Sequence, residues 1–276
     1  MKTNKIGFIG GGNMASSLIS GLIASGHAPE QIWVSDINPD TLTTLKNQLQ
    51  VNTATHNDDV INAVDVVVLA VKPQTLGAVA QSIAVRVQQK NPLVVSIAAG
   101  INQNSLSRWL GADTAIVRCM PNTPALVLTG ATALHANGKV TAEQADLAEN
   151  ILRAVGIALW VDDEAELDAV TAVSGSGPAY YFLLMEAMEK AALELGLTQE
   201  TARLLVQQTA LGAAKIALES NESPEQLRKR VTSPGGTTQQ AIETFEQGGF
   251  SELVSKALHA ARDRSIEMSK QMENSQ

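Results

Sequence analysis

The 276-residue sequence has very little cysteine, few aromatic residues and no excess of positive charge. Its single cysteine, Cys119, excludes an internal disulfide and any metal site built from several cysteines. Aromatic residues make up 3%, which argues against stacking platforms for single-stranded nucleic acid. The formal net charge of −8 repels a phosphate backbone, and no basic run offsets it. We therefore expect no nucleic-acid partner.

Long apolar runs are also missing. No stretch of about 18 residues is apolar enough to span a membrane. Glycines interrupt the first apolar run too early for the hydrophobic part of a signal peptide. The four histidines show no metal-ligand spacing. The sequence thus predicts a cytoplasmic protein with no membrane segment and no metal.

A glycine-rich turn stands at the start of the chain. A short apolar run ends at three glycines, and a helical pattern begins directly after them with Asn13 and Met14. The motif G-x-G-x-x-A is matched by Gly10, Gly12 and Ala15, where a tight turn, a close pyrophosphate and helix–strand packing each need a small residue. The pattern favours dinucleotide binding at a helix N-terminus. A turn that only permits tight packing is the alternative.

The next apolar run ends in Ser35 and Asp36. In Rossmann folds, an acid about 20 residues beyond the glycines receives the adenosine ribose, and a carboxylate there disfavours a 2′-phosphate. Asp36 therefore slightly favours NADH. It is alternatively a turn residue before Asn38 and Pro39.

The chain changes texture near residue 162. Before that point, apolar runs alternate with helical patterns, which is typical of a parallel sheet with crossover helices. We predict an α/β Rossmann domain over residues 1–162 and an all-α dimerisation and substrate-binding domain over residues 163–276. Helices are expected at 164–173, 176–195, 198–220, 223–231, 237–247 and 250–271. Because residues 176–218 are apolar on more than one side, we expect a second chain to cover them.

The ends of the predicted strands carry small residues and prolines. Ligands bind beyond the carboxyl ends of parallel strands, so these residues are candidates for cofactor binding. Lys72 is the nearby cation, and it either meets a pyrophosphate or carboxylate or is a solvated lysine at a helix start. The candidates at these strand ends are Ala70, Val71, Lys72, Pro73, Ala98, Met120, Pro121, Asn122 and Thr123.

Two loops stand out in the helical half. Residues Ser174–Ala179 interrupt a helical stretch, either as a cap aimed at the cofactor or as a kink. Residues Thr232–Thr238 place glycines and hydroxyls at a helix start, which suits either a carboxylate-binding loop or an ordinary capped turn. No lysine stands where β-hydroxyacid dehydrogenases have their catalytic one. Reduction of a C=N bond is therefore favoured over oxidation of an alcohol, since an imine nitrogen is readily protonated.

Six segments together resemble the pyrroline-5-carboxylate reductase family, in order, at the family's spacing and over nearly the whole chain. They are Gly10–Ala15, Ala70–Pro73, Ser96–Gly100, Met120–Pro124, Ser174–Tyr180 and Ser233–Thr238.

The resemblance implies reduction of (S)-1-pyrroline-5-carboxylate to L-proline with NADPH or NADH, the last step of proline biosynthesis. It implies an interlocked homodimer, with the site between the Rossmann domain of one chain and the helical domain of the other, and dimers that often assemble into decamers. Thr238 would be the catalytic residue and would bond the ring nitrogen, and Asn57 would lie near the adenosine. The substrate carboxylate would be bound by Ser233, Gly235, Gly236, Thr237 and Thr238.

Two alternatives keep parts of this pattern. A related imine or cofactor reductase would share the glycine motif but alter the carboxylate loop. A non-catalytic protein that senses NAD(P) would need neither that loop nor the proline-rich segment at Met120.

Overall fold

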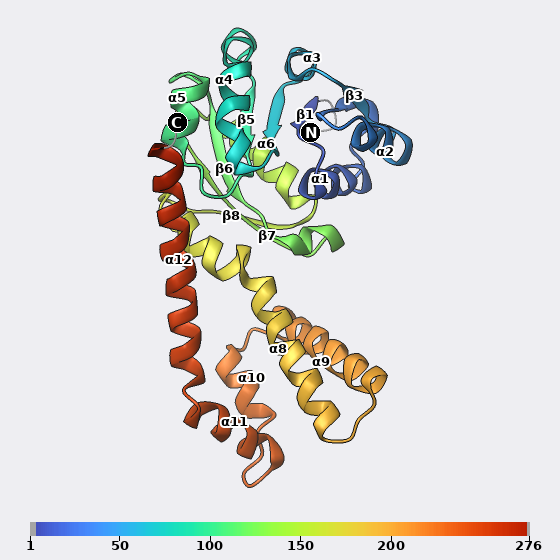
Figure 1. Ribbon diagram of the computed structural model, residues 1–276, viewed down its shortest axis with the longest axis vertical. Coiled ribbons are helices and arrows are strands. Elements are labelled where there is room, and N and C mark those ends of the chain that lie inside the picture. Colours follow the sequence, from blue (N-terminus) through green and yellow to red (C-terminus); the bar gives the residue numbers. More distant parts are fainter. Residues whose placement is uncertain (1–3, 275–276) are drawn as a thin grey trace. The chain divides into compact units, whose positions relative to one another are not determined.

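The computed structural model describes residues 4–274 and contains an eight-stranded sheet in the order β3-β2-β1-β4-β5-β6-β7-β8 (Figure 1). The first six strands follow the Rossmann order, with its switch point between β1 and β4. The predicted α/β class is confirmed. The strands are β1 (Ile6–Ile9), β2 (Ile32–Ser35), β3 (Asn52–Ala54), β4 (Val66–Leu69), β5 (Leu93–Ser96), β6 (Ile116–Met120), β7 (Gly130–Ala136) and β8 (Gly156–Trp160).

Strand β7 runs antiparallel to β6, whereas the other neighbouring strands are parallel. Only the segment from Pro121 to Thr129 joins β6 to β7, and it holds the short 3-10 helix η2 (Thr123–Val127). A parallel connection needs a crossover of a dozen or more residues, so this short segment reverses the chain.

Helices cover both faces of the sheet. One face packs against α1, α2 and α6, and the other packs against α3, α4 and α5. Alternate residues of each strand point to opposite faces, so Phe8 enters the first cluster and Ile9 the second. The covering helices are α1 (Asn13–Ala24), α2 (Pro39–Leu49), α3 (Asn57–Ala63), α4 (Pro73–Lys90), α5 (Gln103–Leu110) and α6 (Ala142–Arg153). The short 3-10 helix η1 (Pro29–Gln31) precedes β2.

The rest of the described chain is helical, as predicted. The expected interruption at residue 174 is a π turn rather than a break, because the Ser176 N–H donates to the Thr171 carbonyl at 2.8 Å. These elements are α7 (Glu166–Val170), η3 (Thr171–Gly175), α8 (Gly177–Glu194), α9 (Gln199–Glu219), α10 (Pro224–Arg230), α11 (Thr237–Gln247) and α12 (Phe250–Asn274).

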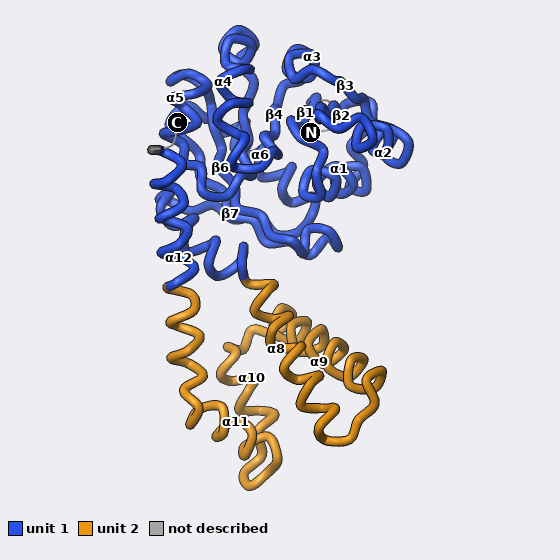
Figure 2. Tube along the Cα trace, in the orientation of Figure 1, with its two compact units in different colours: residues 1–176, 260–276 blue, residues 177–259 orange. Residues whose placement is uncertain are grey.

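The chain forms two compact units (Figure 2). The first contains the residues up to Ser176 together with those from Ala260 on, and the second is Gly177–His259. The end of α12 belongs to the first unit because Ser265 Oγ donates to Asp168 Oδ1 at 2.6 Å. The units therefore divide the chain at other points than the change of texture near residue 162, and the roles expected for 1–162 and 163–276 stay predictions.

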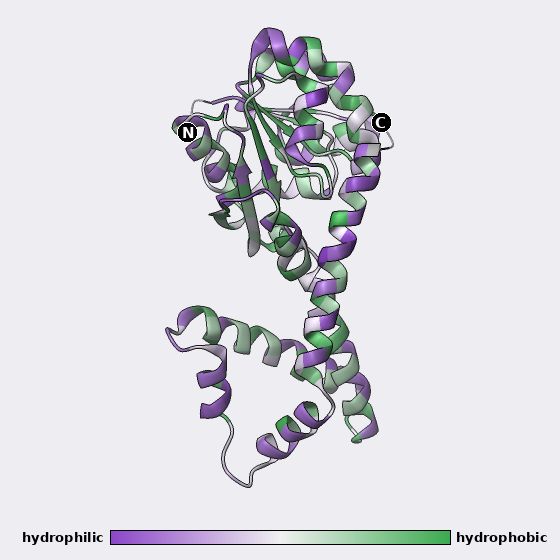
Figure 3. Cartoon of the chain, turned by 90° about the vertical axis from the view of Figure 1, so that its left-hand side faces the viewer, coloured by the Kyte–Doolittle hydropathy of each residue, from purple (hydrophilic) through white to green (hydrophobic). Residues whose placement is uncertain are grey.

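The second unit exposes much of its apolar surface. Hydrophobic residues run along its helices in Figure 3. On α8 and α9 many large apolar side chains are exposed, among them Leu183, Leu204 and Leu211. Within residues 4–274, none of the helices combines the length and apolar character that a membrane span requires.

Candidate active site

The turn between β1 and α1 requires glycine at position 10. Gly10 has φ +101°, a conformation that strains other residues, and its N–H donates to the Ser35 carbonyl at 2.8 Å. A Cβ atom at this position would lie 2.8 Å from the Ala70 carbonyl oxygen. Gly10 therefore fixes the junction of β1, β2 and β4, at the switch point of the sheet.

The backbone conformation at Gly12, in contrast, does not require glycine. Its φ of −68° suits any residue, and a Cβ atom there would meet no described atom within 4 Å. Gly12 is the N-cap of α1, whose first turn holds no acid and receives no side-chain cap from the described residues. The N–H groups of Asn13 and Met14 begin this helix and face no capping side chain. Open space at a helix N-terminus fits the pyrophosphate of a dinucleotide.

Gly11 is a residue that the sequence reasoning missed. Its N–H donates to Asp36 Oδ2 at 2.7 Å, while Asp36 Oδ1 accepts from the Asn38 N–H at 2.8 Å. A Cβ on Gly11 would lie 2.8 Å from Leu45 Cδ1 and 2.9 Å from Thr41 Cγ2. Asp36 thus serves the turn before α2 and also holds the glycine turn in place. The signal in the sequence was the extra glycine between the two motif glycines, Gly10 and Gly12.

Ser35 and Asn57 form a pair at the adenosine end of the predicted site. The Ser35 side chain is buried, and its hydroxyl donates to Asn57 Oδ1 at 2.8 Å. Asn57 is half-buried and opens α3. The structure therefore brings these two candidates together, with Asn57 the more accessible of them.

The candidates after β4 and β5 lie beside the glycine turn and at the same edge of the sheet. Ala70 donates its N–H to the Ile9 carbonyl at 2.9 Å, and Pro73 begins α4. Val71 is half-buried, and Ala98 is buried after β5. Lys72 is exposed and forms no ion pair with the described residues, so its two interpretations stay open.

The loop after β6 is tied by its Asn122 side chain to Ser174 and to the start of β7. Asn122 Nδ2 donates to the Ser174 carbonyl at 3.2 Å and to Ser174 Oγ at 3.1 Å, and Asn122 Oδ1 accepts from the Ala131 N–H at 2.9 Å. Pro121 is buried and Met120 half-buried, whereas Thr123 is exposed. Of the four candidates from Met120 to Thr123, Thr123 is thus the exposed one.

Two buried residues precede this loop. Burial raises the pKa of the Cys119 thiol far above its usual range, so it is a neutral core residue rather than a nucleophile. Arg118, which the sequence reasoning missed, forms an ion pair with Glu164 Oε1 at 2.8 Å. The same oxygen accepts from the Gln103 N–H at 2.7 Å. The signal for Arg118 in the sequence was a charged residue within an otherwise apolar strand.

The loop Ser233–Thr238 lies in the second unit, at the start of α11. Gly235 has φ +73°, and its N–H donates to Gln239 Oε1 at 2.6 Å. The Gly236 N–H donates to the Ser233 carbonyl at 3.0 Å. Within residues 4–274, no side chain caps this helix. The hydroxyls of Ser233, Thr237 and Thr238 donate to no other described group, so N–H and O–H donors are available for a carboxylate.

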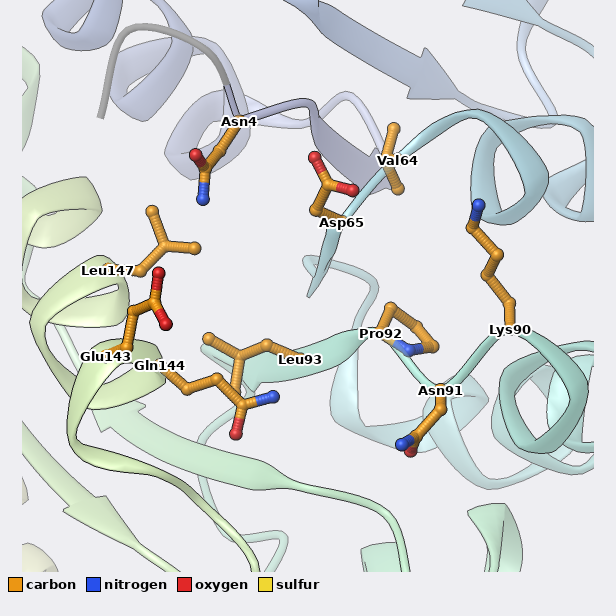
Figure 4. Close-up of a pocket in the computed structure, with 10 residues that line it drawn as sticks. All are labelled: Asn4, Val64, Asp65, Lys90, Asn91, Pro92, Leu93, Glu143, Gln144 and Leu147. Atoms are coloured by element: carbon orange, nitrogen blue, oxygen red, sulfur yellow. The ribbon is translucent and has the colours of Figure 1, made fainter.

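A hollow of about 340 Å³ lies at the opposite, amino-terminal edge of β4 and β5 (Figure 4). Asn4, Lys90 and Glu143 are among the residues that line it. Because dinucleotides bind at the carboxyl edge, this hollow is separate from the glycine turn.

The sheet order and the open glycine turn are those of a dinucleotide-binding protein of the Rossmann class. Residues 5–100 match the family model described as NADP oxidoreductase, coenzyme F420-dependent. Residues 164–268 match the model described as pyrroline-5-carboxylate reductase dimerisation.

The similarity to known proteins extends over the whole chain. A pyrroline-5-carboxylate reductase from Pseudomonas aeruginosa is 52% identical, with 99% of each chain covered. The solved reductase from Coxiella burnetii has a TM-score of 0.93 and 49% identity, covering 97% of this chain and 99% of that one. The Plasmodium falciparum enzyme, solved with NADP bound, has a TM-score of 0.86 and 30% identity, covering 98% and 99%. The chain belongs to the pyrroline-5-carboxylate reductase family.

Proposed function

We propose that the protein reduces the C=N bond of (S)-1-pyrroline-5-carboxylate with NADPH or NADH and so forms L-proline, the last step of proline biosynthesis. The observation that carries this proposal is the full-length relationship at 52% identity to a reductase, which spans both the glycine turn and the loop at Ser233. The NADP bound to the Plasmodium enzyme supports the choice of cofactor.

The first unit holds the cofactor. The N–H groups of Asn13 and Met14, beside Gly12, bind the pyrophosphate, and Asp36 and Asn57 lie near the adenosine. When bound, the reduced nicotinamide supplies a hydride. The residues that would surround the nicotinamide are Ala70, Val71, Lys72, Pro73, Ala98, Met120, Pro121, Asn122 and Thr123.

The loop at the start of α11 holds the substrate. The N–H and hydroxyl of Thr237 and the hydroxyl of Ser233 bind the carboxylate, and Gly235 and Gly236 let it approach the backbone. The dipole of the 11-residue helix α11 favours the negative charge there. Thr238 Oγ1 bonds the ring nitrogen and orients C5 toward the hydride. Because a hydroxyl is too weak an acid to give up its proton unaided, Thr238 relays a proton from water. Most of the rate then comes from holding the reactants in line.

A second copy of the chain completes the enzyme. The exposed apolar side chains of α8 and α9 form the surface of a homodimer, which agrees with the dimerisation model matched by residues 164–268. In that dimer the substrate loop of one chain meets the cofactor side of the other, and dimers assemble further into decamers. The enzyme works in the cytoplasm.

The test is oxidation of NADPH and NADH on addition of pyrroline-5-carboxylate, followed by the absorbance of the reduced nicotinamide. A bulkier cyclic imine serves as the control substrate. Turnover with pyrroline-5-carboxylate alone supports the proposal. No turnover with it refutes the reductase, and equal turnover with the bulkier imine indicates a related imine reductase.

A further inference from the structure

The segment from Ser174 to Pro178 has no part in the proposed reaction, yet it is bound to the loop after β6. Asn122 and Ser174 lie 52 positions apart in the chain, and two hydrogen bonds from Asn122 Nδ2 join them. The third bond of Asn122, from the Ala131 N–H, reaches the start of β7. One side chain thus connects three separate segments of the first unit.

The partners determine how the Asn122 amide is oriented. A backbone N–H can only donate, so Ala131 must face Oδ1. A carbonyl can only accept, so Ser174 must face Nδ2. Reversing the amide would place two donors together and two acceptors together. Both ends of the amide are therefore used by the chain itself.

The sequence explains why the Ser174 carbonyl is free to accept. In an α-helical ladder it would receive the N–H of the residue four positions on. That residue is Pro178, which has no N–H. The π turn before it is closed by the bond from the Ser176 N–H to the Thr171 carbonyl at 2.8 Å, so the ladder is already irregular at this point. Asn122 supplies the missing donor.

Packing holds the two segments closely together. A Cβ atom on Gly175 would lie 2.3 Å from Met120 Cε, so the π turn touches the end of β6. The next open residue of the loop is Thr123, which is exposed and directly follows Asn122. A shift of Asn122 would move Thr123 with it.

We propose that Asn122 is a positioning residue. By binding the carbonyl that Pro178 leaves free, it fixes the loop after β6, and with it Thr123, at the nicotinamide end of the site. The inference rests on the proposed function, because it concerns the geometry of that reaction. Turnover by the wild-type protein tests the proposed function, whereas the ratio of each variant to wild type tests Asn122 alone.

Asn122→Asp keeps the shape of the side chain but loses the donor, and it sets a carboxylate oxygen against the Ser174 carbonyl. We expect kcat to fall about 10- to 100-fold, since a misplacement of about 1 Å can cost that much. The Kd for NADPH, measured by fluorescence titration, should change little because the glycine turn is untouched.

Asn137→Asp is the matched control. Asn137 Nδ2 donates to the Thr114 carbonyl at 3.0 Å, and its Oδ1 accepts from the Ile116 N–H at 3.1 Å, at the other end of β6. The control should lose a similar amount of thermal stability but keep the wild-type kcat. If both variants lose kcat equally, or if Asn122→Asp keeps it, Asn122 has only a structural role.

Pro178→Ala decides the question if Asn122→Asp does not fold. Alanine is a good helix former, and its N–H would compete with Asn122 for the Ser174 carbonyl. A lower kcat with an unchanged Kd for NADPH and an undiminished melting temperature supports the proposal. An unchanged kcat in this folded variant overturns it.

Discussion

The two units of the chain differ in how far they bury their apolar side chains. Among the described residues, the buried apolar set comes almost entirely from the first unit, and Ala202 and Val206 are its members from the second. The second unit instead leaves Leu183 66% and Leu204 61% exposed. A sheet covered on both faces has its own core, whereas the helices of the second unit need a further surface. The first unit thus buries its apolar side chains by itself, and the second unit does not.

The largest effect is expected from charging the second unit. Leu204 and Leu211 lie one heptad apart on α9, and both are exposed. The double variant Leu204→Glu, Leu211→Glu should be monomeric by light scattering and should lose turnover at least about 100-fold, since each buried leucine contributes about 1.5–3 kcal/mol. Val85→Glu is the control, because Val85 is an equally exposed apolar residue of the first unit. If the double variant stays dimeric and active, the exposed leucines of the second unit are not needed for dimerisation, which contradicts the proposed difference between the units.

The next effect distinguishes two glycines within the first unit. Gly10→Ala brings about 1–3 kcal/mol of strain at φ +101° together with a clash at the Ala70 carbonyl, so it should lower the free energy of unfolding and weaken NADPH binding up to about 100-fold. Gly12→Ala should weaken NADPH binding while leaving stability unchanged, because its Cβ meets no described atom. Urea unfolding and fluorescence titration measure the two quantities. If Gly12→Ala lowers the free energy of unfolding as much as Gly10→Ala does, Gly12 is needed for folding and the predicted difference between the two glycines is wrong.

A smaller effect is expected at the substrate loop. Thr238→Ala removes the hydroxyl proposed to relay the proton, and kcat should fall by about 10- to 100-fold. The Kd for NADH should stay nearly unchanged, since Thr238 belongs to the other unit. Thr244→Ala is the control, because that hydroxyl only bonds the Gln240 carbonyl within the same helix, at 2.9 Å. Unchanged turnover in Thr238→Ala would remove it from the mechanism.

Much of the fold could be predicted from local sequence patterns. Helix α11 begins and ends at the predicted residues, 237 and 247, and α9 (Gln199–Glu219) lies within one residue of the predicted 198–220 at each end. The reversal at β7 was not foreseen, although the short connection from Pro121 indicates it. The division into units could not be foreseen, because it depends on bonds such as that between Ser265 and Asp168, which lie 97 positions apart.

A sequence motif can find a residue whose own backbone conformation requires it. Gly10 is required by its own φ, so a motif finds it. Gly11, in contrast, is required because its N–H bonds Asp36 and because a side chain there would clash with Leu45. The Asn122 amide is likewise held by its bond to the Ser174 carbonyl. Such requirements arise only when distant segments meet, so the spacing of residues along the chain does not show which contacts each residue makes.

The smallest effect concerns the choice of cofactor. Asp36→Ala should raise the NADPH/NADH ratio of kcat/KM by a few-fold, because removing a carboxylate near a 2′-phosphate relieves about 1 kcal/mol of repulsion in water. Both absolute values should fall, since the Gly11 N–H loses its acceptor at 2.7 Å. Asp40→Ala removes a nearby exposed charge in the first turn of α2, and it should leave the ratio unchanged. If the ratio stays fixed while both values fall, Asp36 only holds the glycine turn, and the preference is set elsewhere.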